Sequence, residues 1–449
     1  MAFLNPAQPP LAAGAQFPPR RQARYALLVL FLGYMLAFVD RNVVSLLVVP
    51  IEHDLGLSDL QMGLLRGTAF AIFYSIFGFP IAWLVDRYNR RNIVLGGVAV
   101  WSLMTVLAGL SRSFMSFFGA RVGVGAGEAA ILPSATSLIA DYFPPEKRGR
   151  AMGFFASGIF IGSAVALIGG GLLLERLHGQ VTVLPLLGAL HPWQVVLVAA
   201  GLLGLPLFLA ALFVREPPRL YLHGRTMAQA AQQSVGFFET FRQHPRAFGA
   251  HFIGFTALGF ASYGATSWLP TLFMREHHWS ALQVGARLGL MALLLGPLGA
   301  IIGGMVADRM EKAGQRAGKL IVGATAAALT IVPAIVMGLS GSAWLTYAAA
   351  AVLTLCISLI WGVAPGALQE IAHGAVLGRV VAVYTALLNL IGLGLAPPSI
   401  ALLGESIAGK NAGLGTAIAI VIPLACGVAL LAFATSMGAY RQARADLKQ

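Results

Sequence analysis

The chain has 449 residues, of which 58% are hydrophobic and only 10% are charged. A soluble domain carries about 25% charged residues, so a chain this apolar is expected in a lipid bilayer rather than in water. The formal net charge of +13 is not gathered on a soluble module, which argues against a nucleic-acid-binding protein. The sequence contains no zinc-spaced Cys and His set, no phosphate-binding loop and no nucleophile elbow. We therefore expect no metal, no cofactor and no enzymatic activity.

Twelve apolar runs are long enough to cross the hydrocarbon layer, which takes about 20 helical residues. Each run must satisfy its own backbone hydrogen bonds in lipid, so all are predicted to be helices. The sequence thus predicts an all-α polytopic membrane protein. The predicted spans are residues 25–49, 60–85, 93–111, 114–140, 150–173, 191–214, 247–273, 281–306, 319–339, 343–367, 379–403 and 413–438.

The longest connection between spans is 215–246, a charged segment that begins with two prolines after Glu216. We predict that it is a cytoplasmic linker between two six-helix bundles, 25–214 and 247–438. A disordered tail is expected at 1–24 and a second tail at 439–449.

Basic residues are distributed unequally between the two sides of the predicted membrane domain. The loops on the side of both termini hold 22 Lys and Arg residues, and the loops on the other side hold 4. Because basic loops remain in the cytoplasm, we expect a cell inner membrane protein with both termini cytoplasmic. Anionic membrane lipids are the expected neighbours of the basic side.

A short sequence similarity relates the two halves. Ala-Trp-Leu-Val precedes Asp86-Arg87 after the second span, and Gly-Met-Val-Ala precedes Asp308-Arg309 after the eighth. Internal repeats are common in secondary transporters. This similarity, together with the presence of six predicted spans in each half, indicates an internal repeat.

Three motifs resemble signatures of the major facilitator superfamily. Residues 78–91 are similar to its loop 2–3 sequence, 121–128 to its span-4 motif and 141–151 to its loop 4–5 sequence. In addition, Phe-Val-Asp-Arg-Asn at 38–42, with Gly-Glu at 127–128, resembles the Spinster branch, specifically its bacterial members. The resemblance implies two pseudo-two-fold related bundles and alternating-access transport of lysolipids, of the sphingosine-1-phosphate or lysophospholipid type, with proton coupling.

The sequence departs from the superfamily pattern at three positions. Ala82 and Asn89 replace glycines of the loop 2–3 motif, and Ser163 follows Gly162 where an antiporter would have Gly-Pro and then paired glycines. The span-5 motif therefore does not support an exchanger mechanism.

Asp40 and Glu128 lie at similar depths, about 22 Å and about 18 Å from the inner ends of their predicted helices. A charge at this depth costs several kcal/mol unless it meets a partner or water. The resemblance places spans 1 and 4 at a central cavity, so Asp40, Arg41, Arg121 and Glu128 are expected to converge. We predict that Asp40 and Glu128 respond to protons and that Arg41, Asn42 and Arg121 contact the substrate. The alternative is an ion-pair cluster that only fixes helix packing.

The corresponding positions of the second half, 262–269 and 350–357, carry no charge. One charged wall and one apolar wall suit an amphiphile with an ionic head and a long tail. A small organic anion or drug-like compound is the alternative substrate. A channel or receptor is disfavoured, because the sequence shows neither a continuous polar stripe nor a signalling domain. The predicted substrate contacts of the second half are Tyr263, Trp268, Trp361 and Asn389.

The resemblance also implies an inner gate. Asp86 would cap the start of span 11 and Asp308 the start of span 5, since a carboxylate suits the positive end of a helix dipole. The alternative for the arginines near this gate is that they only reflect the excess of basic residues in cytoplasmic loops. We expect a monomer whose partners are a small amphiphilic substrate, protons and membrane lipids, with no nucleic acid. The arginines predicted to add ion pairs at the gate are Arg87, Arg90, Arg148 and Arg309.

Overall fold

The computed structural model describes residues 17–177, 180–184, 188–220, 239, 241–372, 374–410 and 412–447. The predicted all-helical membrane fold is confirmed. Within this part of the chain, eleven helices are long and apolar enough to cross a membrane. The helix α12 (Pro245–Glu276) has 32 residues and occupies the place of the seventh predicted span. Its Ser, Thr and His side chains make it more polar than the other eleven.

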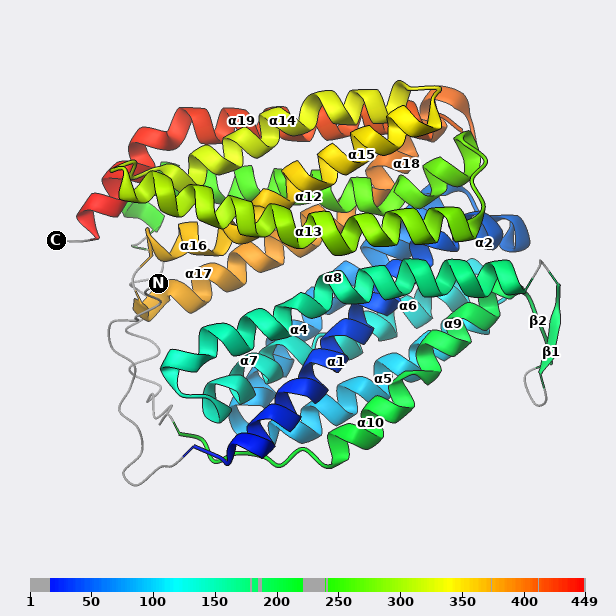
Figure 1. Cartoon of the computed structure of the whole chain (residues 1–449), viewed down its shortest axis with the longest axis horizontal. Coiled ribbons are helices and arrows are strands. Elements are labelled where there is room, and N and C mark those ends of the chain that lie inside the picture. The colour runs from blue at the N-terminus through cyan, green and yellow to red at the C-terminus, as the bar shows by residue number, and fades with distance from the viewer. Residues whose placement is uncertain are drawn as a thin grey trace. The chain divides into compact units, whose positions relative to one another are not determined.

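The described residues up to 220, together with Leu269–Leu293, form a first compact unit. In it, α1 packs along α8, and α5 packs against α6 and α9. Several spans consist of two successive helices, and span 2 contains the π-helical turn η1. The helices of this unit (Figure 1) are α1 (Arg20–Leu46), α2 (Val48–Leu55), α3 (Asp59–Gly63), η1 (Leu64–Thr68), α4 (Ala69–Arg87), α5 (Arg90–Gly109), α6 (Phe114–Glu128), α7 (Ile131–Tyr142), α8 (Pro145–Arg176), α9 (Pro192–Leu202) and α10 (Gly204–Leu212).

The second compact unit contains residues 241–268 and the described residues from Leu294 onward. Here α14 packs along α19 and α15, and α18 also contacts α19. Span 10 is interrupted by a 3₁₀ turn and span 11 by a π-helical turn. The helices that follow α12 are α13 (Ala281–Lys312), α14 (Gly318–Leu339), α15 (Ala343–Ser358), η2 (Leu359–Gly362), α16 (Ala364–Gln369), α17 (Gly374–Leu387), η3 (Leu388–Leu393), α18 (Gly394–Ala408) and α19 (Leu414–Asp446).

The helices extend beyond the spans predicted from hydropathy at both ends of the chain. α1 begins at Arg20, so the basic residues at 20–24 form its first turn. α19 continues to Asp446 and includes most of the predicted C-terminal tail. Residues 1–16 lie outside the described part. Arg and Lys side chains at such ends reach polar surroundings while their aliphatic stems cover apolar surface.

A small hairpin between spans 5 and 6 was not predicted. β1 (Thr182–Leu184) pairs antiparallel with β2 (Gly188–Leu190), with Thr182 opposite Leu190. Three-residue strands are too short to change the hydropathy of a window of about 20 residues. Gly188, at φ 76°, adopts a backbone conformation that glycine allows without strain.

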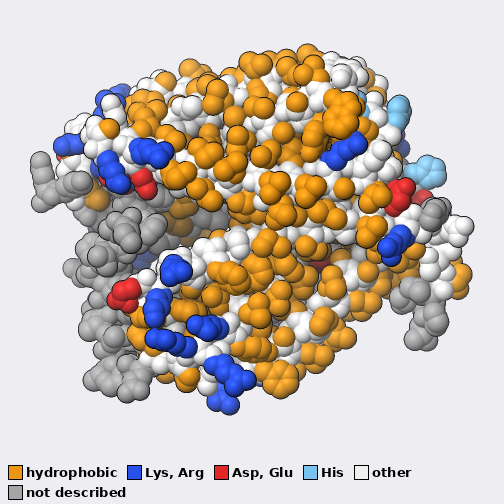
Figure 2. All heavy atoms as spheres, in the orientation of Figure 1, with side chains coloured by type: hydrophobic (Ala, Val, Ile, Leu, Met, Phe, Trp, Pro, Cys, Tyr) orange, Lys and Arg blue, Asp and Glu red, His pale blue; other side chains and the backbone are white. Residues whose placement is uncertain are grey.

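The sides of the helices are apolar. On α13, exposed aliphatic side chains recur every three or four residues, which places them on one face of the helix. Figure 2 shows hydrophobic side chains over most of the face in view, with Lys and Arg mainly toward its two sides. This pattern is expected of helices that face lipid. The exposed set on α13 is Leu290, Leu294, Leu298, Ile301 and Met305.

Close helix contacts depend on glycines that have no room for a side chain. A Cβ at Gly127 would lie 2.6 Å from the backbone nitrogen of Trp101 and 2.9 Å from the carbonyl oxygen of Gly97. A Cβ at Gly158 would lie 3.2 Å from the backbone nitrogen of Met35. Small residues allow backbones to approach in membrane bundles. Gly127 therefore lets α6 approach α5, and Gly158 lets α8 approach α1.

Replacing Gly127 with alanine is therefore expected to separate α6 from α5. Overpacking of this kind costs about 1–3 kcal/mol, so Gly127→Ala should lower the midpoint of thermal unfolding in detergent by several degrees. The matched control is Gly119→Ala on the same helix, where a Cβ has nothing within 4 Å. Equal unfolding midpoints for the two variants would contradict the packing role.

Candidate functional site

Arg41 of α1 and Glu128, the last residue of α6, form an ion pair inside the first unit. The Nε of Arg41 donates to Oε2 of Glu128 at 2.6 Å. The Glu128 side chain has 0% exposure and the Arg41 side chain 15%. Residues 87 positions apart are thus joined where the protein offers little water. Of the four charges that were expected to converge, Arg41 and Glu128 are in direct contact, and Asp40 and Arg121 interact electrostatically with both of them.

Aromatic rings surround the guanidinium of Arg41. Its Cζ lies 4.9 Å from the ring centroid of Phe38, 4.5 Å from Phe70 and 5.0 Å from Tyr74. A cation over a ring face is stabilised by the ring quadrupole. The Nη2 of Arg41 and the Oε1 of Glu128 are buried and have no hydrogen-bond partner among the described residues. The ion pair therefore keeps both a donor and an acceptor for a further ligand.

Arg121 of α6 borders the same aromatic cluster. Its Nε donates to the carbonyl oxygen of Leu65 at 3.5 Å, and its Cζ lies 5.5 Å from the Phe70 ring centroid. Arg121 is buried. The Phe70 ring is thus next to two guanidinium groups, those of Arg41 and Arg121.

Asp40 has a different partner from its neighbour Arg41. Its Oδ2 accepts a hydrogen bond from Oγ1 of Thr105 on α5 at 3.1 Å, and both residues are buried. Successive helical residues point about 100° apart, so Asp40 faces α5 while Arg41 faces α6. Thr105 was not predicted, because a lone threonine in an apolar span carries no sequence signature.

Asn42 joins α1 to α8. Its Nδ2 donates to the carbonyl oxygen of Phe38 at 2.9 Å and to Oγ of Ser163 at 3.1 Å. Ser163 is the residue that departs from the antiporter pattern, and here it supplies an acceptor for Asn42. The structure therefore gives Asn42 a contact within the bundle, and its predicted substrate contact stays a prediction.

The π-helical turn η1 holds another buried arginine. Arg66 lies within an apolar span and is 8% exposed. The wider π turn changes the direction of the side chains that leave it, and such turns occur frequently at functional sites. The same turn supplies the Leu65 carbonyl that binds Arg121.

In the second unit, the predicted residues fall into two groups. The rings of Tyr263 and Trp361 meet edge to face with centroids 6.1 Å apart, and both side chains are partly exposed. Asn389 is buried in the π-helical turn η3. Trp268 has no exposed surface, and its Nε1 donates to the carbonyl oxygen of Pro397 at 2.9 Å. Trp268 therefore fixes α12 against α18.

Comparison with known proteins identifies the family. The model of the Major Facilitator Superfamily matches residues 30–397. The chain belongs to this superfamily. The crystal structure of a bacterial homologue of the human lysosomal transporter Spinster, in an inward-facing and unoccupied conformation, matches with a TM-score of 0.76 at 27% identity, covering 95% of this chain and 98% of that one.

Curated relatives carry different names. An MFS-type efflux pump of Mycolicibacterium smegmatis is 32% identical over 66% of this chain and 65% of its own length. A probable L-galactonate transporter of Escherichia coli is 27% identical over 65% of this chain and 62% of its own length. The chain thus spans less than two thirds of the length of these curated relatives.

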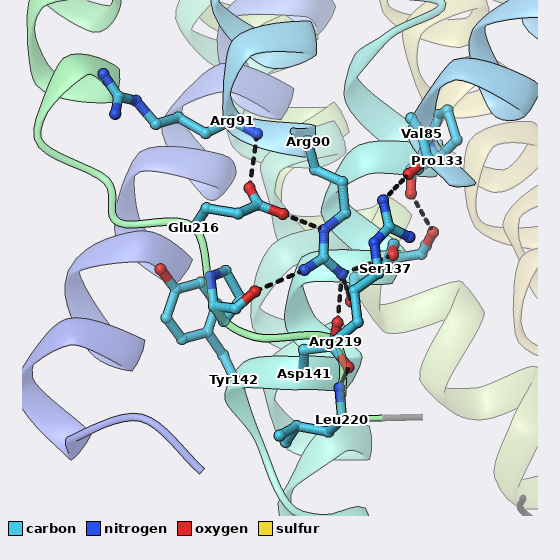
Figure 3. A network of polar contacts seen from close by, with 12 residues as sticks. Val85, Arg90, Arg91, Pro133, Ser137, Asp141, Tyr142, Glu216, Arg219 and Leu220 are labelled. Carbon is cyan, nitrogen blue, oxygen red and sulfur yellow. Dashed lines mark hydrogen bonds and ion pairs between the residues drawn. The ribbon is translucent and has the colours of Figure 1, made fainter. Parts of the chain in front are cut away.

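Arg90, predicted as a gate arginine of this superfamily, belongs to a network inside the first unit (Figure 3). It is fully buried and forms ion pairs with Asp141 and Glu216, the latter at 2.6 Å from its Nε. Its Nη2 donates to the carbonyl oxygen of Pro217 at 3.1 Å. These partners were not foreseen, because Glu216 lies 126 residues away in the predicted linker.

The same network fastens the chain after α10 to the first unit. Arg219 donates to the carbonyl oxygen of Val85 at 2.7 Å, and the backbone nitrogen of Leu220 donates to Oδ1 of Asp141 at 3.2 Å. The described beginning of the predicted linker, 215–220, is therefore held against the helices. The other linker residues, apart from 239 and 241–246, lie outside the described part.

The remaining predicted gate residues lie at exposed helix ends. Asp86, Arg87, Asp308 and Arg309 are exposed, and the Cζ of Arg87 lies 4.1 Å from the Trp83 ring centroid. The predicted caps by the two aspartates join residues of different units and stay predictions. Arg148 donates from Nε to the carbonyl oxygen of Phe143 at 2.9 Å. Within the described part of the chain, no three His, Cys, Asp or Glu side chains form a potential metal site.

Replacing one partner of the Arg41–Glu128 ion pair is expected to destabilise the protein more than replacing both partners. Truncating one partner of a buried pair leaves an uncompensated charge and costs about 3–5 kcal/mol, whereas an apolar replacement of both is often neutral. Arg41→Met and Glu128→Leu should each lower the thermal unfolding midpoint, and the double variant should recover most of the loss.

Arg112→Met, at an exposed loop arginine, is the matched control and should leave the midpoint unchanged. If the two single losses simply add in the double variant, the two side chains do not stabilise one another in the folded protein.

Proposed function

We propose that the protein is a secondary transporter that moves an amphiphilic lysolipid across the membrane by alternating access, coupled to protons. The observation that carries this proposal is the buried Arg41–Glu128 ion pair in an aromatic setting. Membership of the superfamily and the similarity to a bacterial Spinster homologue support the transport class.

The arginines of the first unit suit an anionic headgroup. Arg41 uses Nε for Glu128 and has Nη2 available, and Arg121 lies beside the same Phe70 ring. Guanidinium groups bind phosphate through short, charge-assisted hydrogen bonds. A phosphate that enters this cluster would compete with Glu128 for Arg41.

This competition provides a link between substrate and proton. When Glu128 is ionised, it holds Arg41 in the ion pair. When Glu128 takes up a proton, the Coulomb attraction is lost, and Arg41 becomes available to the headgroup. Burial increases the effect, because an ion pair is stronger where the effective dielectric constant is low. Asp40 precedes Arg41 on α1 and accepts a hydrogen bond from Thr105. It is therefore a second carboxyl group close to this ion pair.

The second unit suits the apolar part of the substrate. Tyr263 and Trp361 form a partly exposed aromatic pair, and neither α12 nor the interrupted span 10 places a charged residue beside it. An acyl or sphingoid chain would gain contact with such rings, whereas a sugar would find few hydrogen-bond donors. This contrast favours an amphiphile over a small polar solute.

A small organic anion is the second candidate substrate. It is favoured by the name of the E. coli relative, a probable L-galactonate transporter, and by the chemistry of Arg41, since a guanidinium binds carboxylate as readily as phosphate. A lysolipid has a long apolar tail and a sugar acid has none. Comparing the transport of the two compounds therefore decides between the candidates.

Transport is tested in proteoliposomes with a labelled lysophospholipid and an imposed pH gradient. The wild-type protein should move the lipid faster with the gradient than without it. Glu128→Gln and Asp40→Asn should each lose most of the gradient-dependent part, because neither amide takes up a proton. Glu175→Gln, at an exposed acid near the end of α8, should behave as wild type. Wild-type rates and pH profiles in both site variants would exclude these carboxylates from coupling.

Substrate class is tested by competition in the same liposomes. Unlabelled lysophospholipid should reduce uptake of the labelled lipid, whereas L-galactonate at the same concentration should have no effect. Arg41→Met should lower lysolipid binding by at least tenfold, which corresponds to one charge-assisted hydrogen bond at about 1.5–3 kcal/mol. Transport of galactonate with no lysolipid transport would establish the second candidate instead.

A further inference from the structure

The helix α13 carries an arginine at the head of its exposed apolar face. Arg287 lies six residues after Ala281, where α13 begins on the side opposite the termini, which is the predicted outer side. The Arg287 side chain is partly exposed. The exposed aliphatic residues of α13 begin three residues later, with Leu290 at 50% exposure. Residues three and four apart share one side of a helix, so Arg287 belongs to this face.

Two glycines show in which direction the face points. A Cβ at Gly285 would collide with a carbonyl oxygen of α8, and a Cβ at Gly289 would lie 3.2 Å from another. Both glycines therefore face α8. At about 100° per residue, Arg287 and Leu294 point about 160–180° away from the direction midway between them. The face is thus turned away from α8, and Figure 2 shows hydrophobic side chains along the course that α13 takes in Figure 1.

The guanidinium of Arg287 is directed toward the start of α13. Helix side chains lean toward the N-terminus of their helix, and the Cζ of Arg287 lies 4.2 Å from the ring centroid of Trp279, two residues before α13. Trp279 in turn stacks on Phe273, with centroids 4.3 Å apart. Tryptophan and extended arginine side chains are typical of the headgroup level of a membrane. The positive charge therefore lies at the depth of lipid phosphates, and the aliphatic residues lie deeper.

The upper part of the face matches the length of one acyl chain. Leu298 follows Arg287 by eleven residues, which corresponds to about 16 Å along the helix axis. One leaflet contributes about 15 Å of hydrocarbon, half of the bilayer core. A lipid with its phosphate at Arg287 would therefore extend its chain as far as Leu298, near the middle of the bilayer.

We propose that this face binds a phospholipid of the predicted outer leaflet, with the phosphate at Arg287 and an acyl chain along Leu290, Leu294 and Leu298. A guanidinium offers five N–H donors, and its hydrogen bonds to phosphate are charge-assisted. An anionic headgroup fits the positive charge of Arg287 better than a zwitterionic one, whose ammonium is repelled by it. The site goes beyond the proposed function, because this lipid stays on the outside of the bundle and is not transported.

The proposal is tested by native mass spectrometry of the purified protein with dioleoylphosphatidylglycerol or dioleoylphosphatidylcholine at equal concentrations. Where phosphatidylglycerol saturates the wild-type protein, Arg287→Gln should carry one lipid fewer, because an uncharged amide binds phosphate about tenfold more weakly. The number of bound phosphatidylcholine molecules should change less. The matched control is Arg112→Gln, at an exposed arginine of another loop on the predicted outer side, which should retain the wild-type number of lipids.

A second pair of variants tests the apolar part of the site. Leu294→Gln should also lose one phosphatidylglycerol, because it places an amide beside the acyl chain. Its control is Leu424→Gln on α19, since Leu294 and Leu424 are similarly exposed, at 62% and 65%. Leu424→Gln should bind as many lipids as the wild-type protein.

Three results would overturn the proposal. One is an unchanged number of bound phosphatidylglycerol molecules in Arg287→Gln and Leu294→Gln. Another is an equal loss in Arg112→Gln, since any basic residue on that side would then suffice. The third is a dimer that Leu294→Gln dissociates, which would assign the face to a second copy of the chain. Because no transport is measured, these outcomes are independent of the substrate.

Discussion

The cost of placing a charge in a medium that cannot solvate it constrains this molecule more than any other interaction. The Arg41–Glu128 ion pair meets that constraint by combining a direct contact with three surrounding rings. Each partner is buried because the other is present, and together they fix the relation of α1 to α6. The close approach of α6 to α5, which Gly127 allows, occurs next to Glu128, the last residue of α6. Helix packing and the candidate site are therefore aspects of one arrangement.

Much of the fold could be predicted from the sequence, because a membrane helix must be apolar over its whole length. Hydropathy located the spans and the superfamily motifs located the charged segments. The predicted positions of the helix ends were less accurate. Arg20 and Asp446 lie in polar stretches, where hydropathy does not indicate at which residue a helix begins or ends. The hairpin at 182–190 was missed because its strands are shorter than any hydropathy window.

The candidate site was predictable in part. Charged residues are rare in apolar spans, so four of them can be recognised in the sequence: Asp40, Arg41, Arg121 and Glu128. The residues that contact them cannot be recognised in this way. Thr105 and Phe70 are ordinary residues of membrane helices, and only the fold brings them to Asp40 and Arg41. Arg90 shows the opposite case, in which a motif residue was expected at a gate and lies in a network closed within one unit.

The short helix α2 has a mechanical consequence. It is joined to α1 through Leu47 alone, which is the sixth residue after Arg41. Its two acids, Glu52 and Asp54, are held by different neighbours, Arg275 of α12 and Trp193 of α9. These two contacts hold the chain that leaves α1 after Leu47, and they therefore restrict the end of α1, the helix that also carries Arg41.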